Sequence, residues 1–285
     1  MGVNVMKVDL SSKTAVITGA GGVLCRMFAC EIAKAGAKVA ALDMNGEAAK
    51  ETASIITKAG GVAIAVECNV LDHDSVINAE KIVYSALGEY NLLINGAGGN
   101  DARTAVTTNE QYRQEDVDDS KVVSFFDILP KAFSKIIDLN LLGTFIPTQV
   151  FVKRMVNTKS PAIINISSMT SFVPLTKALP YGNAKAAVNN LTQWMAVHFG
   201  NVGVRVNAIA PGFFITAQNR AMMVNDDGSL TERSKKIIEH TPLARLGNAE
   251  DLVGPLLFLC DETASGFVSG VVLPVDGGFM AMPCV

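Results

Sequence analysis

The sequence predicts a doubly wound α/β fold, in which helices cover both faces of a mostly parallel sheet to give three layers, α/β/α. Two observations predict it. Short apolar runs alternate with longer amphipathic segments along the chain of 285 residues, and glycine clusters directly follow several of the apolar runs. Because this alternation makes successive strands parallel, ligands are expected at the carboxyl ends of the strands.

Length and composition fit one domain spanning 1–285 with no second-domain boundary. The 24 basic and 27 acidic residues are spread evenly and give a net charge of -3. Neither nucleic acid nor a membrane surface is therefore an expected partner. The amino-terminal stretch does not resemble a secretory signal, and no apolar run is long enough to cross a bilayer, so a cytoplasmic protein is expected.

Hydrophobic residues make up 49% of the chain. This share favours apolar surface buried between subunits, so a homo-oligomer, either a dimer or a tetramer, is expected. The five cysteines include no Cys-x-x-Cys pair and no Cys/His cluster. Reduced thiols and no metal site are expected.

The first strand is expected at 14–18, and Gly19, Gly21 and Gly22 separate it from a helix at 24–35. Strand, glycine turn and helix in this order expose backbone N–H groups that attract a pyrophosphate, as in Rossmann-type dinucleotide-binding folds. An ordinary strand-to-helix turn that uses glycine for its φ angles is the alternative.

The second strand, at 38–42, ends at Asp43. A carboxylate about twenty residues beyond the glycine turn can accept hydrogen bonds from an adenosine ribose and repel a 2′-phosphate, which favours NAD over NADP. A solvated aspartate is the alternative. A helix at 47–59, a strand at 62–68, a helix at 74–87 and a strand at 92–95 follow, and the Asn95–Gly99 run lets the backbone approach a flat ligand.

The alternation breaks at about 100–130, where polar residues dominate; a substrate-proximal excursion is expected there. A long helix is expected over 130–156 with Asn140 midway, either as a bridge between backbone groups or as a placed polar group. Later elements are a strand at 204–208, a helix at 249–260 and a strand at 271–275. A lid is expected at 216–245.

The chemistry centres on the stretch after a strand at 162–166. Tyr181 and Lys185 are four residues apart on a predicted helix, so their side chains share one face. A neighbouring cation stabilises a phenolate, and Lys185 can therefore lower the pKa of Tyr181. A Ser168 hydroxyl beside them can hydrogen-bond a substrate oxygen while Tyr181 exchanges its proton, which suits carbonyl/alcohol interconversion.

Together these motifs resemble the short-chain dehydrogenase/reductase family over essentially the whole chain. The resemblance implies that Tyr181 is the general acid/base, that Lys185 also holds the nicotinamide ribose, that Ser168 fixes the reacting oxygen and that Asn140 positions a proton-relay water. Ser167 competes with Ser168, which has the family's spacing from the tyrosine. The implied cofactor-binding residues are Gly19, Gly22, Val23, Leu24, Asp43, Met44, Asn69, Val70, Asn95, Ala97, Gly98, Tyr181, Lys185, Pro211, Gly212, Phe214 and Thr216.

Three positions depart from the family pattern. Val23 and Cys25 stand where the phosphate turn usually has its later glycines, so the approach of a pyrophosphate is expected to differ. Asn69 stands where an aspartate commonly contacts adenine, and an amide can pair with the adenine amino group as well.

Within the family, phrases such as INGAGGN and QWMAVHFG resemble a branch that acts on sugar acids and interconverts D-fructuronate and D-mannonate. A sugar acid needs cations and hydrogen-bonding side chains. The candidates near the expected site are Asn100, Arg103, Gln149, Lys177, Gln218, Asn219 and Arg220. The alternatives are a reductase of 5-ketogluconate-type acids or 3-oxoacyl thioesters, and an NAD-binding sensor without turnover.

Overall fold

Seven parallel strands form one sheet in the order β3-β2-β1-β4-β5-β6-β7. The computed structural model describes residues 8–100, 106–117, 119–215 and 220–282, with only the backbone at 221 and 222. The strands are β1 (Thr14–Thr18), β2 (Lys38–Asp43), β3 (Ala63–Glu67), β4 (Leu92–Asn95), β5 (Ala162–Ile166), β6 (Arg205–Pro211) and β7 (Val272–Val275). The order reverses between β1 and β4, which creates the crevice where such sheets bind ligands.

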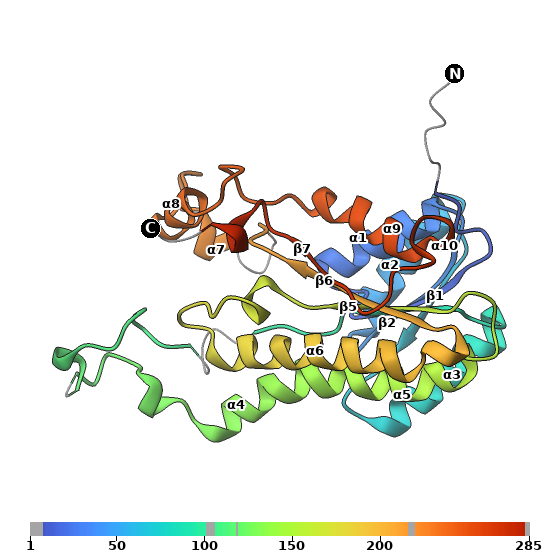
Figure 1. Ribbon diagram of the computed structural model, residues 1–285, viewed down its shortest axis with the longest axis horizontal. Coiled ribbons are helices and arrows are strands. Elements are labelled where there is room, and N and C mark those ends of the chain that lie inside the picture. Colours follow the sequence, from blue (N-terminus) through green and yellow to red (C-terminus); the bar gives the residue numbers. More distant parts are fainter. Residues whose placement is uncertain (1–7, 101–105, 118, 216–219, 283–285) are drawn as a thin grey trace, which may run out of the picture.

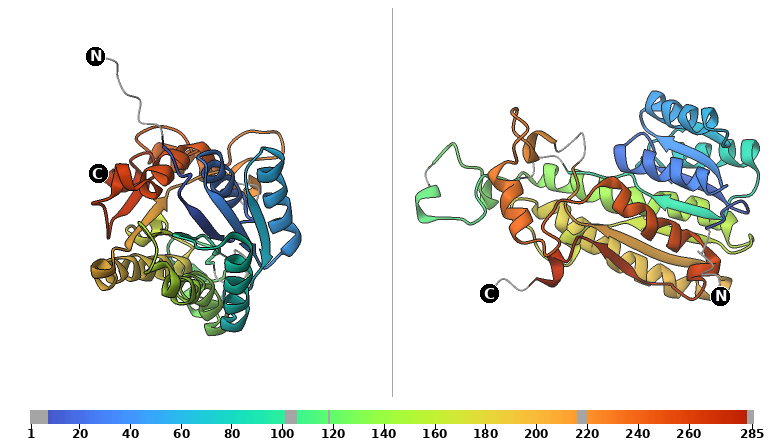
Figure 2. Two further views of the ribbon diagram at one scale, coloured as in Figure 1. Left: turned by 90° about the vertical axis from the view of Figure 1, so that its right-hand side faces the viewer. Right: turned by 90° about the horizontal axis from the view of Figure 1, so that it is seen from above.

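Helices cover both faces of the sheet, as Figures 1 and 2 show. On one face lie α1 (Val23–Lys34), α2 (Gly46–Lys58) and α9 (Val253–Cys260), and on the other lie α3 (His73–Leu87), α5 (Gly143–Met155) and α6 (Leu179–His198). The remaining helices are α4 (Pro130–Ile137), which packs on α6, and the short α7 (Arg220–Met223), α8 (Glu232–Glu239) and α10 (Glu262–Ser265).

The core divides between the two faces because successive side chains of a strand point to opposite sides of the sheet. Ile17 and Ile94 pack in the layer that contains α1 and α9. Their neighbours Val16 and Leu93 pack with α3, α5 and α6. The predicted three-layer, doubly wound fold in a single domain is confirmed.

The long helix expected over 130–156 is wrong as one element. It is divided by a wider π-helical turn, Asp138–Leu142, into α4 and α5. The Asn140 side chain donates to the carbonyl of Ile136, four residues earlier, at 2.9 Å. That carbonyl would accept the Asn140 backbone N–H in a regular α-helix, so the side chain competes with the backbone where the helix widens.

Other boundaries differ by small amounts. The strands expected at 14–18, 92–95 and 162–166 agree residue for residue, whereas β6 runs to Pro211 rather than to 208. The helix expected at 249–260 begins with a 3-10 turn, Ala249–Leu252, before α9. Both polar excursions lie at the same end of the molecule, where the strands have their carboxyl ends (Figure 1).

Cys25, Cys30, Cys68 and Cys260 are free thiols. Within the described residues no helix has the length and apolarity needed to cross a membrane.

Candidate active site

Tyr181 and Lys185 lie in the first turns of α6, which begins at Leu179 and carries Pro180 in its first turn. The Lys185 Nζ is 5.6 Å from the centre of the Tyr181 ring. The same Nζ donates to the carbonyl of Ile166, the last residue of β5, at 2.7 Å. The pair is therefore held against the strand that leads to the serines.

Ser168 is the serine that reaches the tyrosine. Its side chain hydrogen-bonds the Tyr181 hydroxyl, and its Oγ accepts the N–H of Thr170 at 3.3 Å. Ser167 points elsewhere, because its Oγ donates to the Oδ1 of Asn189 on α6. The preference for Ser168 over Ser167 agrees with this geometry.

The pKa of Tyr181 moves in the direction opposite to the expected one. Burial raises it above the ordinary value, and the hydrogen bond from Ser168 opposes that rise only in part. Burial also lowers the pKa of Lys185 to about 8. The cost of burying a phenolate therefore outweighs the stabilisation that Lys185 could give it, because the Lys185 ammonium is itself desolvated and bonded to Ile166. In the chain alone, Tyr181 is protonated at neutral pH.

Asn140 bridges backbone groups, which is one of the two alternatives that the sequence left open. Its Nδ2 donates to the carbonyls of Gly99 at 2.8 Å and Ile136 at 2.9 Å, and its Oδ1 accepts the N–H of Gly99 at 3.1 Å. A Cβ on Gly98 would lie 2.7 Å from that Oδ1 and 3.4 Å from the Nζ of Lys185. Asn140 thus holds the glycine run after β4 against the lysine, and its relay of a proton through water stays a prediction.

The turns after β1 and β4 meet at the reversal point of the sheet. Gly19 has a left-handed φ of 68°, and a Cβ there would lie 2.9 Å from the N and Cα of Ala97. The Thr18 Oγ1 accepts the N–H groups of Gly96 at 3.1 Å and Ala97 at 3.2 Å. The sequence thus needs glycine at position 19, where two backbones come within contact distance.

The residues present fit the pyrophosphate of a dinucleotide. Gly22 is the N-cap of α1 and no side chain caps that helix end, so the N–H groups of the first turn remain free to bind an anion. Cys25 is buried beneath the other turn, since a Cβ on Gly96 would lie 2.1 Å from its Sγ. Burial raises the pKa of the Cys25 thiol to about 12, so it fills space as a neutral group. Of the two residues that replace glycines in this turn, Cys25 is buried and Val23 is substantially exposed.

Asp43 is held by two backbone N–H groups. Its Oδ2 accepts the N–H of Gly21 at 2.9 Å, and its Oδ1 accepts the N–H of Asn45 at 2.9 Å. A Cβ on Gly21 would lie 2.5 Å from the Cβ of Ala48. Because Gly21 has no side chain, the turn after β1 brings the Gly21 N–H to the Asp43 carboxylate and fixes that carboxylate at the carboxyl end of β2.

Two of the predicted adenine-side residues are open to solvent. Met44 and Asn69 are exposed, and the Oδ1 of Asn69 accepts the N–H of Leu71 at 3.1 Å. Val70 is 7% exposed and faces the backbone of Gly143, where a Cβ would lie 3.1 Å from its Cγ2.

Three further predicted cofactor residues have side chains turned into the protein. Leu24 packs partly buried against the core. The Asn95 Nδ2 donates within the interior to the Oγ1 of Thr148 and the Oδ1 of Asn165, each at 2.9 Å. Phe214 is 6% exposed and packs against Gly247. Asn95 and Phe214 can therefore meet a ligand only through backbone atoms.

Pro211 and Gly212 end β6 beside β7. The N–H of Gly212 donates to the carbonyl of Val275 at 2.9 Å, and a Cβ on Gly212 would lie 2.7 Å from the Cα and Cβ of Asp276. The glycine permits the chain to turn away from the sheet here.

The predicted substrate residues are dispersed. Asn100 and Arg220 are exposed near the two excursions, and Lys177 is half-buried in the loop before Tyr181. Gln149 is exposed on α5, next to Thr148, which faces β4. Arg103, Thr216, Gln218 and Asn219 lie outside the described residues.

Three charged residues near Lys177 were missed. Lys236 on α8 binds Glu110 of the first excursion, with 2.5 Å between Nζ and Oε2, and Arg233 adds a second α8 cation near the same carboxylate. The sequence carries a signal for this, because Thr231 followed by ERSKKIIE is a capped amphipathic helix with Arg233 and Lys236 on one side.

A parallel sheet with a glycine turn at its reversal point and a Ser–Tyr–Lys group at its carboxyl edge defines an oxidoreductase. Residues 13–226 match the family described as short chain dehydrogenase, and the chain belongs to that family.

Relatives of similar length agree with this assignment. The uncharacterised oxidoreductase UxuB of Bacillus subtilis (strain 168) is 50% identical over 96% of each chain. A solved structure from Haemophilus influenzae, provisionally called a D-mannonate oxidoreductase and holding NAD, is 46% identical, covers 97% of this chain and 98% of its own, and has a TM-score of 0.93. A Beutenbergia cavernae protein, provisionally called an NAD(P)-dependent gluconate 5-dehydrogenase and holding NADP, is 32% identical over 97% of this chain and 100% of its own, with a TM-score of 0.79.

Proposed function

We propose that this protein is an NAD-dependent oxidoreductase that interconverts a ketone and a secondary alcohol on a sugar acid, namely D-fructuronate and D-mannonate. The observation that carries the reaction type is the hydrogen bond between Ser168 and the Tyr181 hydroxyl, with Lys185 one helical turn away. Such a group can bind a carbonyl oxygen and protonate it.

The chain's own residues handle the proton and the oxygen. The nicotinamide, when bound, supplies the hydride that the carbonyl carbon accepts. Ser168 donates a hydrogen bond to the carbonyl oxygen, and Tyr181 delivers its proton to that oxygen as negative charge develops there. Lys185 carries the positive charge that stabilises the resulting phenolate, and a proton from solvent then restores the phenol. Oxidation of the alcohol follows the same path in reverse.

Two observations support NAD rather than NADP. The Asp43 carboxylate is held by the N–H groups of Gly21 and Asn45, and a fixed negative charge disfavours a 2′-phosphate beside it. The Haemophilus relative at 46% identity holds NAD. The residues proposed to line the cofactor site are those that the family resemblance implies, from Gly19 to Thr216.

The sugar-acid substrate is supported by the similarity to the Haemophilus protein and by the polar character of both excursions. A second candidate is the reduction of a 5-ketogluconate-type acid, which the 32% identity to the Beutenbergia protein favours. An acyl thioester would require an open apolar groove, and the charged contacts of Glu110 and Lys236 at this end oppose one.

The test is the initial rate of NADH and NADPH oxidation by the purified protein with fructuronate, 5-ketogluconate and an acetoacetyl thioester. Reduction of fructuronate with NADH alone supports the whole proposal. Activity with only another ketone contradicts the substrate, a preference for NADPH contradicts the role of Asp43, and binding of NAD with no turnover favours the sensor.

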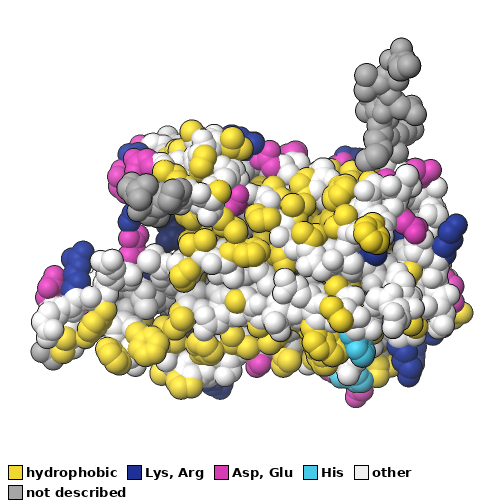
Figure 3. Space-filling model, viewed as in Figure 1, with side chains coloured by type: hydrophobic (Ala, Val, Ile, Leu, Met, Phe, Trp, Pro, Cys, Tyr) yellow, Lys and Arg dark blue, Asp and Glu magenta, His cyan; other side chains and the backbone are white. Residues whose placement is uncertain are grey.

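We also propose a cytoplasmic homo-oligomer, a dimer or a tetramer. Large apolar side chains are exposed on α5 and α6, including Phe145 at 42%, Trp194 at 57% and Val197 at 84%. Hydrophobic atoms also gather over the α4–α6 side of the face in Figure 3. Light scattering during size-exclusion chromatography tests this, and a monomer at micromolar concentration contradicts it.

A further inference from the structure

Three segments that are distant in the sequence bring charged side chains together beside the loop that leads to Tyr181. Glu110 comes from the first excursion, Lys177 from the loop before α6, and Arg233 and Lys236 from α8. Lys236 binds Glu110 directly, with 2.5 Å between Nζ and Oε2. Lys236 therefore pairs with this carboxylate, and Lys177 and Arg233 lie close enough for their charges to act on it, so the group carries an excess of positive charge.

The three cations act on the ionisation of Glu110. The pKa of the Glu110 carboxyl is below its usual range, chiefly because of the hydrogen bond from Lys236, with the positive charges of Lys177 and Arg233 adding to the effect. Glu110 and Lys236 are partly exposed, with 43% and 58% of their side chains accessible. A small anion in solution can therefore compete with Glu110 for these cations.

Lys177 is placed by an uncommon backbone conformation. Its φ is 71°, in the left-handed region that non-glycine residues rarely adopt. Such strain is retained where the surroundings demand it and is concentrated at sites of function. Lys177 also lies four residues before Tyr181, in the loop that leads into α6.

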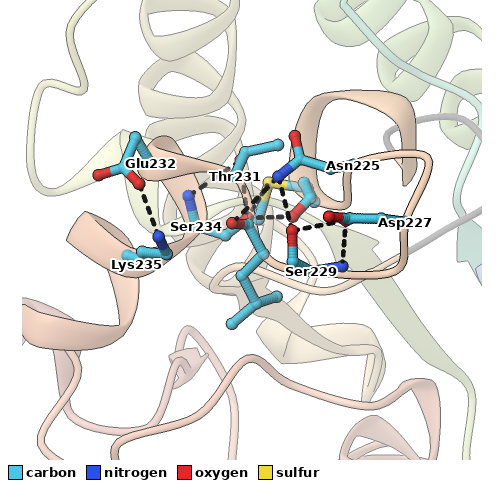
Figure 4. A network of polar contacts seen from close by, with 9 residues as sticks. Asn225, Asp227, Ser229, Thr231, Glu232, Ser234 and Lys235 are labelled. Carbon is cyan, nitrogen blue, oxygen red and sulfur yellow. Dashed lines mark hydrogen bonds and ion pairs between the residues drawn. The ribbon is translucent and has the colours of Figure 1, made fainter.

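Arg233 and Lys236 belong to α8, and Figure 4 shows the polar contacts that hold the start of this helix, around Thr231 and Ser234. Thr231 caps α8 by accepting the N–H of Ser234 at 3.2 Å, and the Ser234 Oγ donates to the carbonyl of Met223 at 2.6 Å. Ser234 and Ile237 are buried, which leaves Arg233 and Lys236 on one exposed side. Lys235 instead pairs with Glu232 at 2.6 Å and provides a matched control.

We propose that Lys177, Arg233 and Lys236 form the site that binds the carboxylate of the substrate, and that Glu110 occupies this site until an anionic substrate displaces it. The inference rests on the proposed sugar-acid activity and extends it to the residues that select an acid over a neutral sugar. The exchange keeps a carboxylate on the same cations and returns Glu110 to solvent, so neither the cations nor Glu110 is left as an unpaired buried charge.

The test compares KM and kcat for fructuronate in Lys177→Gln, Arg233→Gln, Lys236→Gln, Glu110→Gln and the control Lys235→Gln. Loss of any one of the three cations should raise KM about three- to tenfold with kcat nearly unchanged. Loss of Glu110 removes the competitor, so Glu110→Gln should lower KM about threefold. Lys235→Gln should match the wild type.

If Glu110→Gln lowers KM and Lys236→Gln raises it, the residues form an anion site rather than a simple ion-pair latch between the two excursions. If both variants raise KM together, the ion pair acts as a latch and the proposal is wrong. It is equally wrong if all three cation variants stay within twofold of Lys235→Gln.

A second measurement separates this proposal from the proposed function. If the wild type reduces no sugar keto acid, the function fails, and NAD-loaded protein is titrated calorimetrically with gluconate. Binding that Lys236→Gln weakens and Lys235→Gln retains supports an anion site of some other enzyme. No binding, or equal binding by both variants, overturns the site as well.

Discussion

Lys185 is expected to cost the protein stability at neutral pH, and its replacement by methionine should reveal that cost. Burial lowers its pKa from 10.5 to about 8, a difference equivalent to roughly 3 kcal/mol. At pH 7 the lysine is protonated in both states, so the folded state carries the full penalty of a desolvated charge. Between about pH 8 and 10.5 the folded state releases the proton before the unfolded chain does, so stability rises with pH.

Lys185→Met removes this penalty and also removes the hydrogen bond to Ile166. Loss of that bond offsets about 1 kcal/mol of the gain in stability. The variant should therefore be more stable than the wild type at pH 7, and its advantage should shrink by roughly 2 to 3 kcal/mol by pH 10. Urea unfolding at several pH values measures this, with the exposed Lys58→Met as the control for loss of a surface charge. If the free energies of unfolding of the variant and the wild type differ by the same amount at every pH, the reasoning is refuted.

The remaining predictions concern the site. Tyr181→Phe should lower kcat about 10²- to 10⁴-fold while NAD binding, measured by calorimetry, is retained; unchanged turnover would remove Tyr181 from the mechanism. Asp43→Asn should raise the ratio of kcat/KM for NADPH over NADH about tenfold or more, and an unchanged ratio would mean that its charge does not select the cofactor. Gly98→Ala should reduce both activity and stability, the latter by about 1–3 kcal/mol, because its Cβ would lie 2.7 Å from the Asn140 Oδ1. Gly200→Ala, where a Cβ meets open space, should change neither.

The sequence by itself determined the fold and the chemical type of the site. Alternation of apolar runs and amphipathic segments is a local property, and it predicted strands such as 92–95 to the residue. The spacing of Tyr181 and Lys185 likewise follows from helix geometry alone. The left-handed φ of Gly19 could also be anticipated from a glycine turn between strand and helix, whereas its close approach to Ala97 could not.

Tertiary structure decided the matters that depend on contacts between distant segments. The sign of the Tyr181 pKa shift follows from how deeply the fold buries the phenol, which no spacing reveals. The break in the long helix lies where the Asn140 side chain bonds both the carbonyl of Ile136 and that of the distant Gly99. The ion pair between Glu110 and Lys236 joins residues that are 126 positions apart, so the sequence alone could not reveal it.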